Sequence, residues 1–590
     1  MSLNAKTAFQ EELSYLHELG TEFSEQNPKL SRYLSAKAKD PDVERLLEGF
    51  AFLTSRIRLK LDDEFPELSH GLIQLLWPSY LRPIPAMTLM QFYPRDKTIT
   101  EATAMDPGAE VVSKPIEGTP CRFRTCGKVI LLPLDITSVE TTRSRAAGSL
   151  EIGLKTQEDL SLAQIRAGQI RFHLTGESHV AQSLYLWIFR FCEGISFIPD
   201  DGSEPISLSS DQVRPGGFLD TDTLLPYPSN VFVGYRLLQE LFSFPQKFLC
   251  FDLYGLDQVD LPEGVKGGTL KFEFSRPLPA EARVRQRHVQ LHCSPAVNLF
   301  DHNADPIILD GHESAYHLRP SSRMPHHFDI FSVEKVQGTR VGRGGNEKVR
   351  EFPAFESFAH EVERMEGRSV AYYRTRLSPN PATQRLAHYI SFIAEDETVS
   401  SDASETITTD LLCTNAGLPE ALAVGDICER NQHSPEFTEF SNLTEPTSSI
   451  PPPTDGSLYW ILISNLSLNY LSLNDAESLR TIISTYDFRA YHDRQAELVG
   501  RQREKGIINI ETKPYDIFHK GLPIRGLRSV LTLKESAFET EGEMYLFGTV
   551  ISEFFSMYAS INSFHELEVR GQESGESYRW PIRNGRSPLM

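Results

Sequence analysis

Residues Asp40–Phe92 read DPDVERLLEGFAFLTSRIRLKLDDEFPELSHGLIQLLWPSYLRPIPAMTLMQF and open with a helix start signal. Asp40 can cap the first free N–H groups, and Pro41 suits the first helical position because its missing donor costs nothing there. The helical pattern then continues without a break as far as Pro66, which corresponds to ~36 Å at the helical rise. We therefore predict one long helix over this stretch.

Apolar side chains fall on two faces of this predicted helix. Phe52 and Leu59, seven apart, form a narrow stripe. It lies almost opposite a broad face that, at about 100° per residue, collects Val43, Leu46, Leu47, Phe50, Leu53, Ile57 and Leu61. Either a neighbouring helix of the same chain covers the stripe, or the helix lies at the centre of a bundle that includes another protein. Arg56 and Lys60 can pair with the acidic run Asp62–Glu64 or with a partner. Phe52, Leu59, Arg56 and Lys60 are thus the candidate partner-interface residues.

The predicted secondary structure changes from helices to strands after about residue 85. Residues 1–85 are predicted to form an N-terminal helical module, with a third helix from about Glu67 to Trp77 and a proline-rich connection after it. From Ala86 the apolar period changes from 3.6 to 2, which predicts strands. The expected strands are Ala86–Pro94, Cys121–Thr125, Lys128–Thr141, Gly148–Thr156, Gly168–Gly176, Ser183–Phe191, Gly194–Gly202, Gly268–Arg276, Ala282–Cys293 and Phe328–Gly338. Strands with few helices between them favour antiparallel, sandwich-like sheets, so residues 86–360 are predicted to be one or two β-rich domains.

Residues 361–590 mix both structure types and predict a C-terminal α+β domain. Helices are expected at Leu458–Leu473, Ala476–Tyr486, Ala490–Lys505 and Met544–Ile561, and strands before and between them. The segment from Arg430 to Gly456 is rich in Ser, Thr and Pro and exceeds the usual length of a structureless loop, so we expect an exposed excursion or partial disorder. The glycine-rich, basic segment Gly338–Glu351 is expected to be a hairpin tip or a docking loop for an acidic partner.

Composition excludes several classes of function. The 590 residues suggest two to four domains, and the net charge of −21 argues against nucleic-acid binding and against a polybasic membrane anchor. No segment approaches the ~18 apolar residues of a membrane span, and the N-terminus has no secretion signal, so a cytoplasmic protein is expected. The seven cysteines fit reduced thiols. The close pair Cys121 and Cys126 lacks zinc-site spacing.

No catalytic signature is present, and no cofactor is expected. His312–His317 (HESAYH) has three residues between Glu and the second His, which does not suit a zinc-protease helix, and it is expected to form strand and turn. A phosphate loop and a nucleophile elbow are also missing from the sequence. Two functions therefore compete. One is a non-enzymatic assembly subunit, and the alternative is a hydrolase that uses carboxylates on a β-sandwich scaffold.

Several separated blocks of the chain resemble the TssF family, baseplate subunits of the bacterial type VI secretion system that are related to wedge proteins of contractile phages. The first block is residues 43–87, within the stretch quoted above. The others, in the family's order, are Gly234–Leu253, Ser294–Phe300, Cys413–Pro419, Ile463–Leu473, Tyr545–Phe564 and Trp580–Arg586.

The resemblance implies a set of partners that the residues alone do not. Two TssF copies would embrace one TssG, and TssK and TssE would complete a wedge of the cytoplasmic baseplate. Six such wedges would surround the hub spike VgrG beneath the contractile sheath and tube. The baseplate would dock on the inner-membrane complex without inserting this chain into the membrane. The resemblance carries over no catalytic residue, metal or cofactor, and it suggests that the C-terminal domain pairs with a second copy.

Overall fold

The computed structural model describes residues 13, 45–54, 73, 77–95, 99–157, 160–165, 168–227, 232–258, 264–309, 313–341, 347–355, 371–379, 386–394, 405–452, 475–519 and 522–585. The chain divides into two compact units, Met1–Ile73 with Thr454–Trp460 and Gln74–Pro453 with Ile461–Met590. In the first unit, residues 45–54 form a helix, as predicted. Most of the expected helical module, including the acidic run Asp62–Glu64, lies outside the described residues, as does the expected helix Leu458–Leu473. Every helix and strand that carries a label belongs to the second unit.

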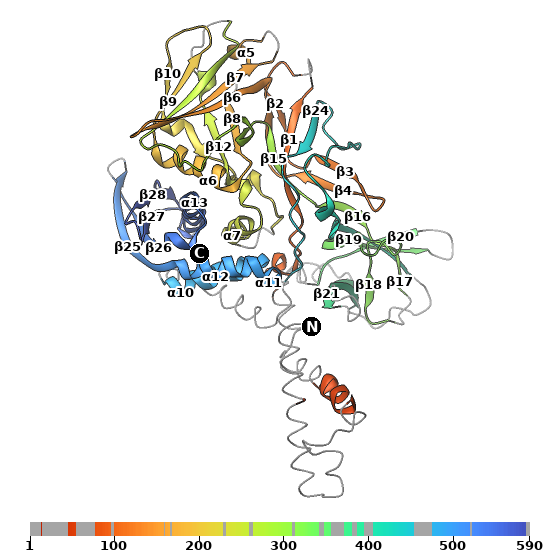
Figure 1. Cartoon of the computed structure of the whole chain (residues 1–590). Helices are drawn as coiled ribbons and strands as arrows, with labels where there is room; N and C mark the ends of the chain where they lie inside the picture. Colours follow the sequence, from red (N-terminus) through yellow and green to blue (C-terminus); the bar gives the residue numbers. More distant parts are fainter. Residues whose placement is uncertain are drawn as a thin grey trace, which may run out of the picture. The chain divides into compact units, whose positions relative to one another are not determined.

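A five-stranded antiparallel sheet joins strands that are far apart in the sequence (Figure 1). Its order is β24–β1–β15–β4–β3, which are Thr438–Asn442, Met87–Pro94, Cys293–Val297, Thr119–Thr125 and Glu110–Ile116. Phe92 and Phe440 face each other in the register of β1 and β24, and both are buried. The small pair β2 (Thr103–Met105) and β5 (Val129–Leu131) packs on the same core.

The prediction of an exposed or disordered excursion from Arg430 is wrong up to residue 452. This segment supplies β24, and the side chain of Asn442 is buried. The Asn442 Oδ1 atom accepts hydrogen bonds from the N–H groups of Gly425 (2.9 Å) and Ile427 (3.0 Å). Because polar side chains satisfy buried backbone groups here, a Ser/Thr/Pro-rich composition is compatible with an ordered structure.

Two more sheets lie next to each other and share a core. One has the order β10–β9–β13–β7–β6, which are Ile206–Leu208, Cys192–Pro199, Gly267–Phe274, Gly148–Thr156 and Leu134–Arg143. The other has the order β11–β12–β8–β14, which are Val213–Pro215, Cys250–Tyr254, Gln169–Leu174 and Val289–Gln290. The rings of Phe251 and Phe272, one from each sheet, are 5.7 Å apart. The short helix α5 (Leu162–Ile165) follows β7.

A third group of strands spans the expected domain boundary at residue 360. Its sheets are β16–β23–β19–β20 with β17, and β18–β22–β21. In sequence these are β16 Phe300–Asn303, β17 Ile307–Leu309, β18 Tyr316–Leu318, β19 Asp329–Val341, β20 Glu347–Phe352, β21 Ala371–Pro379, β22 Leu386–Ala394 and β23 Glu405–Thr414. β19 and β20 form the predicted hairpin. Because β22, β23 and β24 pair with strands that precede residue 360, this residue does not separate one sheet from another. Whether three folding units exist stays a prediction.

The C-terminal region packs helices on a sheet. The sheet order is β25–β26–β27–β28 with β29, which are Ile507–His519, Leu522–Leu533, Phe564–Gly571, Ser577–Arg579 and Arg583–Asn584. β26 and β27 pair in parallel, and every other ladder between described strands is antiparallel. The helices are α10 (Ala476–Tyr486), α11 (Phe488–His492), α12 (Arg494–Gly506) and α13 (Glu541–Tyr558). The overall class is the predicted α+β fold with many antiparallel strands.

α13 is enclosed by its own chain. It contacts β27 on one side, and it also packs against α6 (Ser178–Leu186) and α7 (Gly234–Ser243) (Figure 1). Its apolar residues are buried, so the pairing with a second copy that the resemblance suggests for the C-terminal domain does not use an exposed apolar face of this helix. The rings of Tyr235 and Tyr486 stack at 4.6 Å and link α7 to α10.

Two expected strands have a different structure. Ser183–Phe191 forms the end of α6 and a π-helical turn, Trp187–Phe191. Because residues 180–188 are buried on all sides, periodicity cannot distinguish strand from helix there. Ala282–Cys293 contains a 3-10 turn, the two-residue β14 and only the first residue of β15. The His288 Nδ1 atom accepts the Arg285 N–H (2.8 Å) and closes the turn. Among the described residues, no helix combines the length and apolar character needed to cross a membrane.

Candidate interaction surfaces

The helix at residues 45–54 exposes apolar side chains on both of its predicted faces. Leu46, Phe50 and Leu53 of the broad face are 73%, 58% and 58% exposed, and Phe52 of the narrow stripe is 39% exposed. Ala51 is fully buried. The pattern shows that a face is apolar but not which molecule covers it, and most of the broad face within residues 45–54 is exposed. The whole run is a candidate surface for another protein.

The four predicted interface residues can be located only in part. Phe52 lies within the described helix, where it has contacts and is more than a third exposed. Arg56, Leu59 and Lys60 lie outside the described residues. Their role at an interface stays a prediction.

A buried charged network surrounds α7. Glu240 is fully buried, and its Oε1 atom accepts hydrogen bonds from the N–H groups of Leu224 (2.8 Å) and Leu225 (3.3 Å). Its Oε2 atom is paired with the buried ammonium of Lys247, and the Arg236 guanidinium is 3.8 Å from the carboxylate. Every carboxylate oxygen is thus paired, which suits a structural role rather than acid–base catalysis.

The carboxylates nearest to a described cavity are also paired. Asp222 and Asp252 both bind Arg171, at 3.0 Å and 2.7 Å. The adjacent cavity, lined by Arg171, Asp222 and His292 among others, has a volume of about 80 Å³. Ligand sites usually exceed ~300 Å³. These groups give no support to the alternative of a carboxylate-dependent hydrolase.

Several buried cysteines and histidines in the described regions have structural environments. Burial raises the pKa of the Cys121 thiol to about 11 and that of Cys126 to about 12. The His292 Nε2 atom accepts the Leu132 N–H at 3.1 Å. Within the described ranges, no three His, Cys, Asp or Glu side chains gather as a metal site would require.

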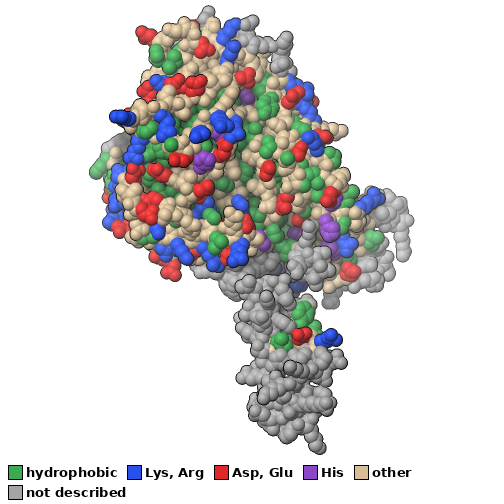
Figure 2. Space-filling view, viewed as in Figure 1, with side chains coloured by type: hydrophobic (Ala, Val, Ile, Leu, Met, Phe, Trp, Pro, Cys, Tyr) green, Lys and Arg blue, Asp and Glu red, His purple; other side chains and the backbone are tan. Residues whose placement is uncertain are grey.

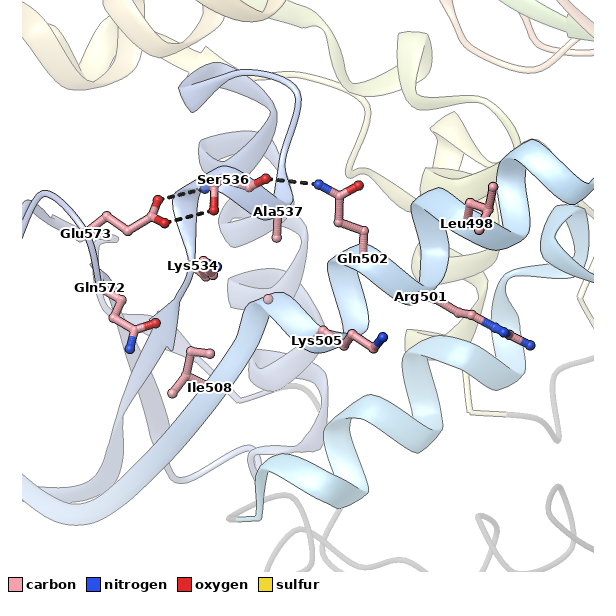
Figure 3. A pocket seen from close by; sticks show the side chains of 11 residues that line it. Leu498, Arg501, Gln502, Lys505, Ile508, Lys534, Ser536, Ala537, Gln572 and Glu573 are labelled. Carbon is pink, nitrogen blue, oxygen red and sulfur yellow. Dashed lines mark hydrogen bonds between the residues drawn. The ribbon is translucent and has the colours of Figure 1, made fainter.

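An open groove lies between α12 and the C-terminal sheet (Figure 3). Its volume is about 1010 Å³, and its lining is Leu498, Arg501, Gln502, Lys505, Gly506, Ile508, Lys534, Ser536, Ala537, Gln572 and Glu573. Leu498 is 61% exposed and Ile508 is 36% exposed. Figure 2 shows Lys and Arg side chains along the edge of the second unit that contains α12. The groove therefore combines apolar side chains with cations.

Two carboxylates hold one wall of this groove in place. Glu573 accepts hydrogen bonds from the backbone N–H (3.0 Å) and the hydroxyl (2.8 Å) of Ser536, as Figure 3 shows. In return, Glu535 accepts the N–H groups of Glu573 (2.9 Å) and Ser574 (2.8 Å). These hydrogen bonds help to lower the pKa of Glu535 to about 2, against the opposing effect of burial. Gln502 donates to the Ser536 carbonyl at 3.0 Å and ties α12 to the same wall.

Our reading of the sequence did not identify this groove. Its residues come from α12, β25, the segment directly after β26 and the turn after β27, and no local motif connects them. The one signal in the sequence is on α12, where Leu498 and Val499 stand among Arg494, Arg501 and Lys505. A helix that exposes leucine and valine beside cations indicates a surface that another molecule can cover.

The chain matches known proteins along almost its whole length. A family model described as "Type VI secretion system, TssF" matches residues 1–587. The type VI secretion system component TssF1 of Pseudomonas aeruginosa is 29% identical over 634 residues, which cover 99% of each chain. A chain of the cryo-electron microscopy structure of the TssK–TssF–TssG baseplate subcomplex is 31% identical, with a TM-score of 0.74 over 92% of this chain and 100% of that one. A chain of the baseplate complex from the type VI secretion system is 28% identical, with a TM-score of 0.68 over 99% of this chain and 100% of that one.

Proposed function

Because the chain belongs to the TssF family of the type VI secretion system, we propose that it is a structural subunit of the baseplate wedge. In this proposal two copies bind one TssG, and TssK and TssE complete the wedge. The wedges surround the hub spike VgrG and nucleate the contractile sheath and tube. The protein acts in the cytoplasm, at a baseplate that is recruited to the inner-membrane complex, and it performs no catalysis.

One observation carries this proposal. A chain of the solved TssK–TssF–TssG subcomplex superposes on 92% of this chain with a TM-score of 0.74 at 31% identity. Agreement over nearly the whole length supports the proposal that this chain enters a complex of the same kind. The paired carboxylates around Arg171 and Glu240 are consistent with a scaffold rather than an active site.

The helix at residues 45–54 is the proposed contact with TssG. Four large apolar side chains within ten residues are between 39% and 73% exposed, and burying each one would stabilise a complex by about 1.5–3 kcal/mol. Phe52, Arg56, Leu59 and Lys60 belong to the same proposed surface. A second copy, if it meets this one through the C-terminal domain, does so through surfaces other than the buried α13.

The test uses the TssG-like and TssK-like proteins of the same organism. The affinity-tagged chain, co-expressed with both, should retain them through size-exclusion chromatography, and deletion of its gene should abolish sheath assembly in cells. A chain that retains neither protein, or a deletion strain that still assembles contracting sheaths, would show the proposal to be wrong.

A further inference from the structure

The groove beside α12 has an unusual balance of charge for this protein. The whole chain carries a net charge of −21, yet Arg501, Lys505 and Lys534 line the groove against one carboxylate, Glu573. Both oxygens of that carboxylate already accept hydrogen bonds from Ser536. An anion that enters the groove would therefore meet cations whose charge the groove itself does not neutralise.

The cations that line the groove differ in whether a neighbouring carboxylate already neutralises their charge. Arg501 forms an ion pair with Glu497 at 2.6 Å, and both side chains are largely exposed. No described residue forms an ion pair with the ammonium groups of Lys505 and Lys534. Lys505 lies on the last turn of α12 and Lys534 directly follows β26, so they reach the groove from two different elements. Two separate cations can recognise two acidic groups of one segment.

Contacts within this chain fix the walls of the groove, so the groove is preformed. A Cβ atom at Gly506 would collide with the Cβ of Ala537, so the end of α12 lies directly against the wall. The reciprocal carboxylate bonds of Glu535 and Glu573 fix that wall, as described above. A preformed site loses less conformational entropy on binding than a flexible one does.

The volume and the polarity of the groove indicate which class of ligand it can bind. About 1010 Å³ is at the upper limit of small-molecule sites, and the groove is open along one side. Leu498 and Ile508 offer apolar contacts that a bare phosphate or carboxylate cannot use. A short segment of protein that carries both acidic and apolar side chains can use the cations and the apolar residues together.

We propose that this groove binds a short acidic and apolar segment of another protein chain in the baseplate. The partner is a different protein and not a second copy of this chain. The inference rests on the proposed function, because it names a second surface through which the subunit is held. The net charge of −21 disfavours the binding of an acidic segment to the protein as a whole, so an unneutralised pair of cations also helps to select where it binds.

The test places a photo-crosslinking amino acid at Leu498 in the full chain, within assembled baseplates in cells. A second sample carries it at Phe50, in the proposed TssG contact, and a third at Val424, which is 55% exposed and far from both in sequence. The Leu498 sample should yield a cross-linked peptide from another protein, rich in Asp and Glu with apolar residues between them. Mass spectrometry of the cross-linked peptide identifies it.

Charge reversal gives the second arm. Lys505→Glu combined with Lys534→Glu should reduce the Leu498 cross-link at least about tenfold and leave the Phe50 cross-link unchanged. Lys513→Glu is the matched control, since that lysine is exposed on β25 and is not part of the groove lining. The exposed positions of all three lysines should leave the soluble yield unchanged.

The outcomes separate this inference from the proposed function. If Phe50 cross-links to a baseplate protein while Leu498 gives no cross-link, a basic peptide or a peptide of this chain, the groove proposal is overturned and the proposed function stands. A Leu498 cross-link that survives the double charge reversal overturns it as well. If neither position cross-links to another protein, both proposals fail together.

Discussion

At the scale of single residues, Glu240 and Lys247 form a buried ion pair within the second unit, and both charges are costly to remove from water. Both side chains have almost no contact with solvent. Removal of a charge from water costs several kcal/mol, and a buried pair is tolerated only when each member is satisfied by the other and by further hydrogen bonds. Glu240 meets this condition through the N–H groups of Leu224 and Leu225. The ion pair therefore holds α7 to the 3-10 turn Pro245–Phe248 that follows it, and the two N–H bonds hold α7 to the segment before it.

The first prediction follows from that pair. Lys247→Met should destabilise the protein by about 3–5 kcal/mol, because it leaves the buried Glu240 carboxylate without its cation. Addition of Glu240→Gln should recover part of the loss. The midpoint of thermal unfolding and the soluble yield measure both effects. Lys114→Met, which breaks the exposed pair with Asp426, should leave the midpoint nearly unchanged; an equal loss in both lysine variants would contradict the argument.

The second prediction concerns pH. Burial lowers the pKa of His173 and His565 to about 3 and that of His292 to about 4, from an ordinary value near 6.5. The unfolded chain therefore binds more protons than the folded chain below pH ~6.5. The contribution of each neutral, buried histidine to stability is fully present above that pH. As the pH falls towards the folded pKa, the free energy of unfolding decreases by up to about 1.4 kcal/mol per pH unit for each histidine.

Thermal unfolding between pH 7.5 and pH 4.5 measures this dependence. His565→Gln removes one buried titrating group and keeps an atom that can pair with the Ser529 hydroxyl, so the fall in midpoint with pH should be shallower. His433→Gln, at an exposed position, should leave the slope as it is. A slope that does not change in His565→Gln would show that other groups cause the acid sensitivity.

At the scale of elements, the sequence predicts best where the apolar pattern is long and has clear ends. α13 agrees with the prediction within a few residues, and Thr540 caps it by accepting the Glu543 N–H at 3.0 Å. β19 agrees with the expected strand Phe328–Gly338, whereas β20 occupies residues that were expected in the hairpin tip Gly338–Glu351. In α13 and β19 local propensity and tertiary packing favour the same structure.

The elements that the sequence analysis predicted wrongly or missed can be explained in physical terms. Ser183–Phe191 is apolar on every side because α13 and the neighbouring sheet enclose it, so no period remains to distinguish helix from strand. β24 was not recognised because its partner β1 lies more than 300 residues away, and only the tertiary fold satisfies its polar groups. The groove shares this difficulty, since Lys505 and Lys534 come from separate elements. At the helix of residues 45–54, the pattern identified apolar faces but could not say that they would be exposed.

The third prediction tests the contact between α13 and α6. A Cβ atom at Gly542 would collide with the backbone carbonyl of Gln182, which cannot rotate away as a side chain could. Gly542→Ala should therefore destabilise the protein by about 1–3 kcal/mol, although alanine favours helices. Gly417→Ala is the control, because a Cβ there meets nothing within 4 Å. A stabilised Gly542→Ala variant would mean that the two helices can separate freely.

The fourth prediction concerns the helix at residues 45–54. Phe50→Asp should leave the midpoint of unfolding nearly unchanged and strongly reduce capture of a TssG-like partner, since Phe50 is 58% exposed. Ala51→Asp should instead lower soluble yield, because it places a carboxylate at a fully buried position, at a cost of several kcal/mol. Glu48→Gln, on the exposed surface, should change neither. Calorimetry and pull-down distinguish the outcomes, and a Phe50→Asp variant that unfolds would mean that its face is internal.

At the scale of the whole molecule, the order of strands in space does not follow their order in the chain. β1 lies between β24 and β15, and β19 lies between β23 and β20. Three sheets therefore contain strands from both sides of residue 360. The buried Phe440, Ile407 and Leu411 belong to cores that also contain residues from before residue 360. Residues 86–360 and 361–590, which the sequence suggested as separate domains, are expected to depend on each other.

The last prediction tests that dependence by dividing the chain at residue 360. Expressed alone, residues 1–360 lack β23 and β24, which leaves the edges of β19 and β1 unpaired and their cores open, so this fragment should aggregate. Residues 361–590 lack the partners of the same strands and should also be insoluble. Co-expressed, the two fragments should pair through these ladders and copurify in equal amounts without a covalent link. Analytical ultracentrifugation and thermal unfolding of each preparation provide the measurement. If residues 1–360 alone sediment as a monomer and unfold cooperatively, the boundary at residue 360 is a true domain boundary, and the strands from residues 405–442 add to a core that is already stable without them.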